Sequence, residues 1–300
     1  MALRRERGAA AEVAGVVGCV VEPGESLYGA ACRTVREAVD APLEPWAVDL
    51  SGDCAWFAVD VPDAVAVPTE GVVSTGSTSR GADSTSRGAD STTRAGSTTR
   101  AGSTDRGLEL SVRVPVVTIA FRPLTRADFA DVVRWQGQPY VARWWQDEAT
   151  DVAAAEAHYG PALDGSDPTR MWVLEANGRS VGLLQDYAIG DHPEWALLTA
   201  RPEAIGVDYL IGDPTWVGRG IGTRMLWTFL RDVVRPHYPR ASGYFAAPDH
   251  RNAASLRVLD KLGFSRGLWS DEPQPGGRVD TVVGCSLDVA RVLGPVTSGK

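Results

Sequence analysis

Alternating hydrophobic and polar residues predict several strands after residue 116. Val117, Ile119 and Phe121 alternate with other residues, a period that predicts a strand. The pair Asn177-Gly178 favours a type I′ turn, so the runs on either side of it predict a β-hairpin. The predicted strands are Val117 to Phe121, Met171 to Glu175, Val181 to Tyr187, Gly206 to Ile211, Tyr244 to Ala247 and residues 279–287.

Caps and apolar spacing predict four helices between these strands. Thr125 and Asp128 have the spacing of a capping box, which predicts a helix that runs through Trp135. The other helices are predicted over Asp151 to Tyr159, Gly220 to Val234 and Asn252 to Leu262. This mixture of strands, hairpins and helices predicts an α/β fold.

A glycine-rich turn connects the predicted strand at 206–211 to the helix that begins near Gly220. Glycines 218, 220 and 222 allow backbone N–H groups to converge on an anion, and the positive end of the helix dipole points to the same place. This arrangement predicts a pyrophosphate site and therefore a nucleotide-bearing cofactor. The spacing differs from the Rossmann fingerprint, and no Lys-Ser or Lys-Thr pair follows, as a P-loop would require.

This turn resembles the acetyl-CoA loop of the GNAT superfamily of N-acetyltransferases. Gly220-Ile221-Gly222 takes the last three places of the family pattern, and Val217 stands at the first place, where Arg or Gln is usual. Asn252 and Leu262-Gly263-Phe264 follow in the family's order. The resemblance covers about residues 116 to 290 and implies a GNAT-type mixed β-sheet, splayed open around the cofactor and flanked by helices.

Within the superfamily, the chain resembles the aminoglycoside 6'-N-acetyltransferases and the related siderophore-biosynthesis lysine N-acyltransferases. The matching segments are Val141 to Trp145, Gly182 to Tyr187, Gly206 to Asp208 and the glycine-rich turn. The resemblance implies acetyl-CoA as co-substrate and an amine as acceptor. The cofactor-binding residues that it implies are Ile211, Val217, Gly218, Arg219, Gly220, Ile221, Gly222, Thr223 and Asn252.

Asp208 is the candidate catalytic residue. It lies in the middle of a predicted strand between apolar neighbours, where a carboxylate is costly unless it has a partner. The matching carboxylate of the family holds or deprotonates the acceptor amine, whereas an ion pair with a nearby Arg is the structural alternative. A Tyr that protonates the CoA thiolate is common in the family, but Leu259 occupies its place, and nothing in the sequence directs Tyr209 or Tyr244 to the sulfur.

The candidate substrate-binding residues are aromatic, amide and acidic. Aromatic faces stack on sugars and attract cations, and carboxylates bind ammonium groups. The alternative is that Trp144 belongs to the core and that the acids are simply solvated. Related aminoglycoside enzymes have an acid just before the Pro of the strand-to-helix loop; here Ala247 stands there and Asp249 follows two positions later. The candidates are Trp144, Trp145, Gln185, Tyr187, Asp191 and Glu194.

Composition and net charge limit the kinds of molecule that this protein is expected to bind. A formal net charge of −8 argues against nucleic acid as the main partner and suits a polycationic small molecule. The four cysteines and four histidines have no metal-ligand spacing, which predicts no metal site and reduced thiols. No apolar run has the length of a membrane span. We therefore expect a cytoplasmic protein, either monomer or homodimer.

Two further segments precede the acetyltransferase-like region, which we place at 116–292. Residues 71–110 repeat Ser, Thr, Arg and Gly in short units and predict a disordered linker. Residues 1–70 contain a degenerate resemblance to a Nudix box, near residues 15–45. Glu25 and Glu37 are kept, but Cys19 and Asp40 replace the opening and closing glycines of the box, and Thr34 and Ala38 replace two of its glutamates. Because a magnesium site needs those carboxylates, we interpret this segment as a truncated, inactive remnant, with a small helical cap as the alternative.

The sequence thus predicts an acetyl-CoA-dependent N-acetyltransferase that modifies a primary amine of a small cationic acceptor in a ternary complex. An aminoglycoside is the leading candidate for that acceptor. One alternative is a siderophore-type hydroxylysine N-acyltransferase. Another is a catalytically weak acyl-CoA-binding module, which Leu259 favours because it cannot donate a proton. Protein amino-terminal acetylation is a minor option.

Overall fold

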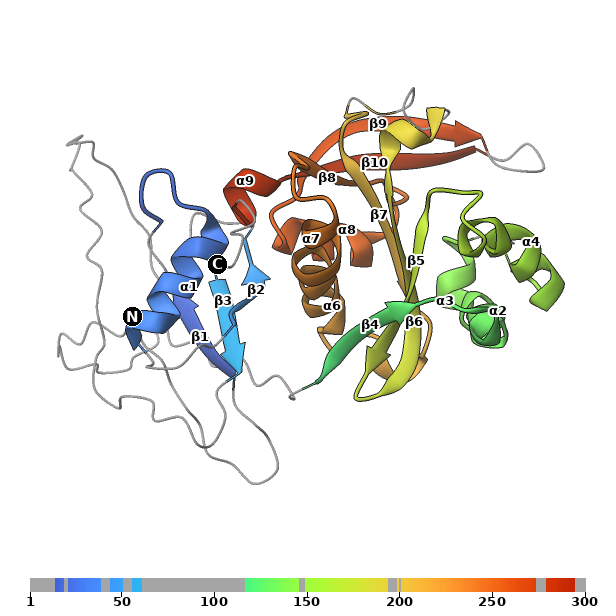
Figure 1. Ribbon diagram of the computed structural model, residues 1–300, viewed down its shortest axis with the longest axis horizontal. Coiled ribbons are helices and arrows are strands. Elements are labelled where there is room, and N and C mark those ends of the chain that lie inside the picture. The colour runs from blue at the N-terminus through green and yellow to red at the C-terminus, as the bar shows by residue number, and fades with distance from the viewer. Residues whose placement is uncertain are drawn as a thin grey trace, which may run out of the picture.

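The computed structural model describes residues 14–18, 21–38, 44–50, 56–60, 117–145, 149–193, 199, 201–273 and 279–294. These residues form two β-sheets, which Figure 1 shows side by side. The smaller sheet is antiparallel, with the order β1-β3-β2: β1 (Ala14–Gly18), β3 (Trp56–Asp60) and β2 (Trp46–Asp49). One helix of this amino-terminal part, α1 (Leu27–Ala38), follows β1.

The larger sheet has seven strands in the order β4-β5-β6-β7-β8-β10-β9. Its pairs are antiparallel except for β7 and β8, so the sheet is mixed. The strands are β4 (Ile119–Pro123), β5 (Arg170–Ala176), β6 (Arg179–Ala188), β7 (Ile205–Ile211), β8 (Gly243–Ala246), β9 (Ser265–Pro273) and β10 (Val279–Asp288).

Helices cover both faces of this sheet (Figure 1). On one face lie α2 (Phe129–Gln136), α3 (Pro139–Ala142) and α4 (Val152–Leu163). On the other lie α6 (Ile221–Phe229), α7 (Arg235–His237) and α8 (Ala253–Lys261); the short α9 (Val289–Val292) ends the described chain. A π-helical turn over Leu230–Val234 joins α6 to α7, immediately before Pro236, which has no N–H for the helical ladder.

The sheet opens between its two parallel strands. β7 and β8 pair only at Ile205–Tyr244 and Gly206–Phe245, although β7 continues to Ile211. Beyond Gly206, the edge of β7 that faces β8 therefore has no strand partner. This opening confirms the splayed mixed sheet that the resemblance implied, and it places a gap at the centre of the fold.

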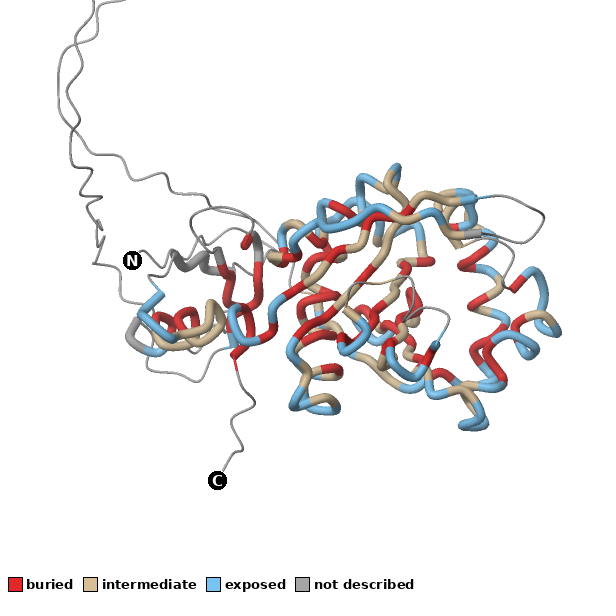
Figure 2. Tube along the Cα trace, turned by 90° about the horizontal axis from the view of Figure 1, so that it is seen from above, coloured by how far each residue is buried: buried red, intermediate tan, exposed pale blue. Residues whose placement is uncertain are grey.

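The amino-terminal part packs against the helices that cover one face of the large sheet, as the run of buried residues in Figure 2 illustrates. Trp227 of α6 is completely buried, and Tyr28 and Phe57 approach its ring edge-on, each with a centroid distance of 5.6 Å. Leu50 donates its N–H to the carbonyl of Lys261 at the end of α8. One hydrophobic core therefore runs from this part into the large sheet.

Two predictions about the segments before residue 116 remain predictions. The linker at 71–110 lies outside the described residues, as do Cys19 and Asp40 of the Nudix-like box. Glu25, a carboxylate that the box keeps, forms hydrogen bonds with Arg33 of α1, and this ion pair lowers the pKa of Glu25. Among the described residues, no three acidic, His or Cys side chains lie close enough together to hold a metal ion.

Most predicted elements of the large sheet are confirmed. Asn177 and Gly178 both have positive φ, 51° and 72°, as a type I′ turn requires. Thr125 and Asp128 form the capping box, which opens a 3-10 turn that leads into α2. The elements that were not predicted include the short helices α3, α7 and α9 and the edge strand β9. In the described part of the chain, no helix is both long and apolar enough to cross a membrane.

Candidate active site

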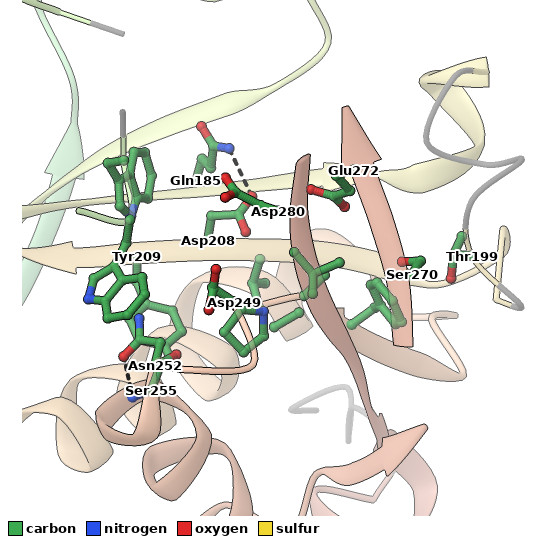
Figure 3. Close-up of a pocket in the computed structure, with 18 of the residues that line it drawn as sticks. Gln185, Thr199, Asp208, Tyr209, Asp249, Asn252, Ser255, Ser270, Glu272 and Asp280 are labelled. Atoms are coloured by element: carbon green, nitrogen blue, oxygen red, sulfur yellow. Dashed lines mark hydrogen bonds between the residues drawn. The ribbon is translucent and has the colours of Figure 1, made fainter. Parts of the chain in front are cut away.

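A cavity of about 380 Å³ lies where β7 and β8 diverge. Figure 3 shows it bounded by β7, by the β9–β10 hairpin and by the start of α8. Its polar lining includes Arg143, Gln185, Tyr187, Thr199, Asp208, Tyr209, Asp249, Asn252, Ser255, Ser270, Glu272 and Asp280. The cavity therefore contains groups able to bind an amine and to move its proton.

Asp208 of β7 lies within this cavity and is held by two neighbours on β6. Gln185 donates its side-chain N–H to Oδ2 of Asp208 at 2.9 Å, and the Tyr187 hydroxyl donates to the same oxygen at 3.1 Å. Among the described residues, no hydrogen bond to Oδ1 is found, which leaves this oxygen for an incoming amine. Burial raises the pKa of Asp208, although both hydrogen bonds oppose the shift. A carboxylate with a raised pKa is a better proton acceptor.

Tyr187 reaches Asp208 because residue 206, its partner across the strands, is glycine. A Cβ at position 206 would lie 2.3 Å from Cε2 of Tyr187 and 2.9 Å from its hydroxyl oxygen. The Tyr187 ring therefore lies directly against the backbone of β7. The aromatic edge of His192 contacts the same ring at a centroid distance of 5.1 Å, which further fixes its orientation.

Replacing Gly206 with Ala should displace Tyr187 and loosen the hold on Asp208. Because the overlap involves a half-buried ring packed against the backbone of β7, we expect a loss of about 1–3 kcal/mol in unfolding free energy and a kcat roughly tenfold lower, the cost of a misplaced catalytic group. Thermal unfolding and steady-state turnover measure the two effects. Gly190→Ala is the matched control, since its Cβ would have no neighbour closer than 3.4 Å. A Gly206→Ala enzyme as active as the control would contradict the packing argument.

Three more carboxylates line the cavity. Glu272 of β9 and Asp280 of β10 face each other across the hairpin, and Asp249 lies in the loop before α8. Burial and the nearby charges of Asp208 and Asp280 raise the pKa of Glu272. Asp249 is bound by both Nε and Nη2 of Arg251, and these hydrogen bonds lower its pKa. Nη2 of Arg251 also lies 3.8 Å from Oδ1 of Asp280. Arg251 therefore neutralises part of the acidity of the cavity, at Asp249 and at Asp280.

The predicted substrate-binding residues fall into three groups in the structure. Trp144, Trp145, Gln185 and Tyr187 line the cavity. Asp191 is exposed and is absent from the cavity lining. Glu194 lies outside the described residues. Trp144 and Trp145 thus line the same cavity as Asp208. The acidic residues of the cavity that were not predicted, Glu272 and Asp280, come from the β9–β10 hairpin.

The glycine-rich turn lies at the start of α6. Gly218 and Gly220 have positive φ, 75° and 77°, a conformation that glycine adopts without strain. Gly220 is the N-cap residue of α6, and in the described part of the chain no side-chain cap hydrogen bond is formed there. Residues 217–220 are exposed. Uncapped amides at a helix N-terminus suit a pyrophosphate, so the turn fits the nucleotide end of acetyl-CoA.

The remaining cofactor candidates lie around this turn. Ile211 is half-buried at the end of β7, and Thr223 is buried in the first turn of α6. The side chain of Asn252 accepts the N–H of Ser255 and so caps α8, while it also lines the cavity. Leu259 is buried in the core, where it contributes no polar group.

Residues 125–270 match the family described as an acetyltransferase (GNAT) domain. The chain therefore contains a GNAT acetyltransferase domain, and the protein is an acetyl-CoA-dependent N-acetyltransferase. Two relatives, from Klebsiella pneumoniae and Serratia marcescens, are described as aminoglycoside N(6')-acetyltransferase type 1. Each is 23% identical to this chain over 152 residues, which cover 50% of this chain and 75% of the relative.

A solved structure shares the fold. An uncharacterized protein from Bacillus halodurans has a TM-score of 0.50 at 18% identity, with 58% of this chain and 85% of that one covered. The crystal structure of aminoglycoside acetyltransferase AAC(6')-Ib with coenzyme A has a TM-score of 0.48 at 21% identity, and the match covers 57% of this chain and 95% of that one.

Glu272 and Asp280 were not among the substrate-binding residues predicted from the sequence. They are 64 and 72 positions beyond Asp208 in the chain, on a strand pair of which only one strand was predicted. One signal was present, because Asp271 and Glu272 stand next to Pro273 in a stretch without hydrophobic alternation. That pattern is typical of a solvent-exposed edge strand.

Proposed function

We propose that this enzyme acetylates a primary amine of a small polycationic acceptor, with an aminoglycoside that carries a 6'-amine as the leading candidate. One observation carries the proposal: four carboxylates line one cavity, where Arg143 is the sole cation among the described lining residues. Such a lining favours ammonium groups. The two 23% identical relatives, which are described as aminoglycoside acetyltransferases, support the same acceptor class.

The residues have distinct roles in the proposed reaction. Oδ1 of Asp208 accepts a proton from the acceptor amine, directly or through water, while Gln185 and Tyr187 hold Oδ2. Glu272 and Asp280 bind a second ammonium group of the acceptor. Trp144 and Trp145 supply the apolar face against which a sugar ring stacks. The glycine-rich turn binds the pyrophosphate of acetyl-CoA.

The test is release of CoA thiol by the full chain from acetyl-CoA, with a panel of amine acceptors. We expect turnover with kanamycin, tobramycin and neamine, and none with an aminoglycoside whose 6'-amine is replaced by a hydroxyl. Hydroxylysine derivatives and spermidine represent the other acceptor classes. Turnover confined to hydroxylysine would support the siderophore alternative, and acetyl-CoA binding without any turnover would support the binding module.

A double variant, Glu272→Gln with Asp280→Asn, tests the proposed ammonium site. We expect the KM for the acceptor to rise about tenfold, equivalent to about 1.4 kcal/mol, because two charges that face the acceptor are removed. The KM for acetyl-CoA should not change. Asp271→Asn is the matched control, since Asp271 is an exposed neighbour on β9 that does not line the cavity. Equal acceptor KM values for the double variant and the control would refute the assigned site.

A further inference from the structure

The acetyl-transfer reaction needs a proton donor on the leaving-group side. A bond forms between the acceptor nitrogen and the acetyl carbon, and the bond between that carbon and the CoA sulfur breaks. Overall the amine loses one proton and the sulfur gains one. Asp208 accounts for the first proton, and Leu259, an apolar side chain buried in the core, cannot account for the second.

Ser255, whose hydroxyl pairs with that of Tyr209, lies on the same face of α8 as Leu259. Asn252, Ser255 and Leu259 have the spacing i, i+3 and i+7, so they lie along one face of α8. The hydroxyl oxygen of Tyr209, on β7, lies 2.7 Å from Oγ of Ser255. Tyr209, Asn252 and Ser255 all line the cavity. β7 thus places the Tyr209 hydroxyl against α8, one helical turn before Leu259.

Asp208 and Tyr209 are consecutive residues of β7, so their side chains leave the strand on opposite faces. Figure 3 shows the consequence: Asp208 lies beside Gln185 on one side of β7, while Ser255 and Asn252 lie on the other. The unpaired edge of β7 separates the two sides. An acetyl group at this edge would meet the amine on the Asp208 side and lose its sulfur on the Tyr209 side.

We propose that Tyr209, with Ser255 behind it, is the proton donor to the departing sulfur of CoA. Tyr187, also in the cavity, is already committed, because its hydroxyl donates to Asp208. The Tyr209–Ser255 contact can relay a proton, since either oxygen can be the donor. Tyr209 gives its proton to the sulfur as the carbon–sulfur bond breaks, and solvent restores it through Ser255. The inference rests on acetyl transfer alone and does not depend on which amine is the acceptor.

The chemistry of the pair is consistent with this role. The Tyr209 hydroxyl is protonated at neutral pH and can donate a hydrogen bond to the sulfur, whereas burial raises its pKa and makes it a weaker acid than an exposed Tyr. A thiolate is a weaker base than a phenolate, which limits the benefit of full proton transfer. We therefore expect a contribution at or below the lower end of the range for general acids, about 10- to 100-fold in rate.

The experiment compares Tyr209→Phe with the parent enzyme for two acetyl donors, acetyl-CoA and its selenoester analogue. A selenolate leaves without prior protonation, so the loss of the donor should matter only for the thioester. We expect kcat with acetyl-CoA to fall about 10- to 100-fold and kcat with the selenoester to stay within about twofold of the parent. Slow acetyl-CoA hydrolysis without an amine provides the same comparison independently of the acceptor.

Calorimetric titration with CoA provides a readout that does not involve turnover. The Kd of Tyr209→Phe for CoA should match that of the parent, because the ring remains. Tyr244→Phe is the matched control: its hydroxyl is buried without a hydrogen-bond partner among the residues that the structure describes, and it does not line the cavity. Unchanged turnover of Tyr209→Phe with acetyl-CoA would overturn the proposal. An equal loss with both donors, or a tenfold weaker CoA affinity, would also overturn it, since either result indicates a structural role.

Discussion

Replacing Asp208 with Asn should lower kcat/KM for the amine acceptor by roughly 100- to 10,000-fold, the range for loss of a general base. Asn can accept the hydrogen bonds of Gln185 and Tyr187 with its side-chain oxygen, so the fold should remain. The variant cannot accept a proton from the amine. Steady-state kinetics with the best acceptor of the panel measure the loss, and Asp271→Asn, on an exposed part of β9, is the control.

The pH profile separates a base from a positioning group. Burial raises the pKa of Asp208, and the reaction needs its charged form. The kcat of the parent should therefore rise with pH through a midpoint above the ordinary Asp value of about 4, and the Asn variant should lack this limb. If the variant kept more than a tenth of the parent kcat with the same pH limb, Asp208 would not be the base.

Asp186 should have the largest effect on stability. Its side chain is completely buried and accepts hydrogen bonds from Arg170 and Trp172, each at 2.8 Å. The Arg170 guanidinium also lies 5.2 Å above the ring of Tyr238. Asp186→Asn leaves this largely buried cation without its counter-charge, so we expect a loss of about 3–5 kcal/mol in unfolding free energy. Urea denaturation, followed by tryptophan fluorescence, measures it.

A double-mutant cycle determines how much of that loss belongs to the ion pair. Arg170→Met removes the cation and keeps an apolar stem of similar length. In the double variant, Asp186→Asn should cost about 1–3 kcal/mol less than it does alone, because the unpaired charge is gone. Strictly additive losses would show that Asp186 acts through packing or through Trp172 instead.

The sequence predicts elements well where short-range chemistry determines them. Asn177-Gly178 and the Thr125–Asp128 capping box act within a few residues, and both form as predicted. The position of Asp208 in an apolar strand correctly indicated a partly buried carboxylate with hydrogen-bond partners. Gln185 and Tyr187 were predicted as substrate-binding residues and not as partners of Asp208. Only the register of β6 against β7 brings them to Asp208, and the sequence alone does not give that register.

The rest of the site depends on long-range packing. β9 is an edge strand with Leu268 74% and Trp269 63% exposed, so neither face needs the apolar period that identifies a strand. Without β9, Glu272 has no predicted position. The pairing of Tyr209 with Ser255 joins a strand to a helix that begins more than forty residues later, and no local pattern encodes such a contact.

Because the amino-terminal part packs against α6, substitutions in that part and substitutions in the β9–β10 hairpin should affect different properties of the enzyme. Trp227 and Arg224 contact Phe57 and Trp46 on this side of α6, and the glycine-rich turn stands at the start of the same helix. The acceptor end of the cavity is built from β9 and β10, which lie elsewhere in the sheet. Substitutions in the first sixty residues should thus alter cofactor affinity, whereas the β9–β10 hairpin can diversify toward new acceptors.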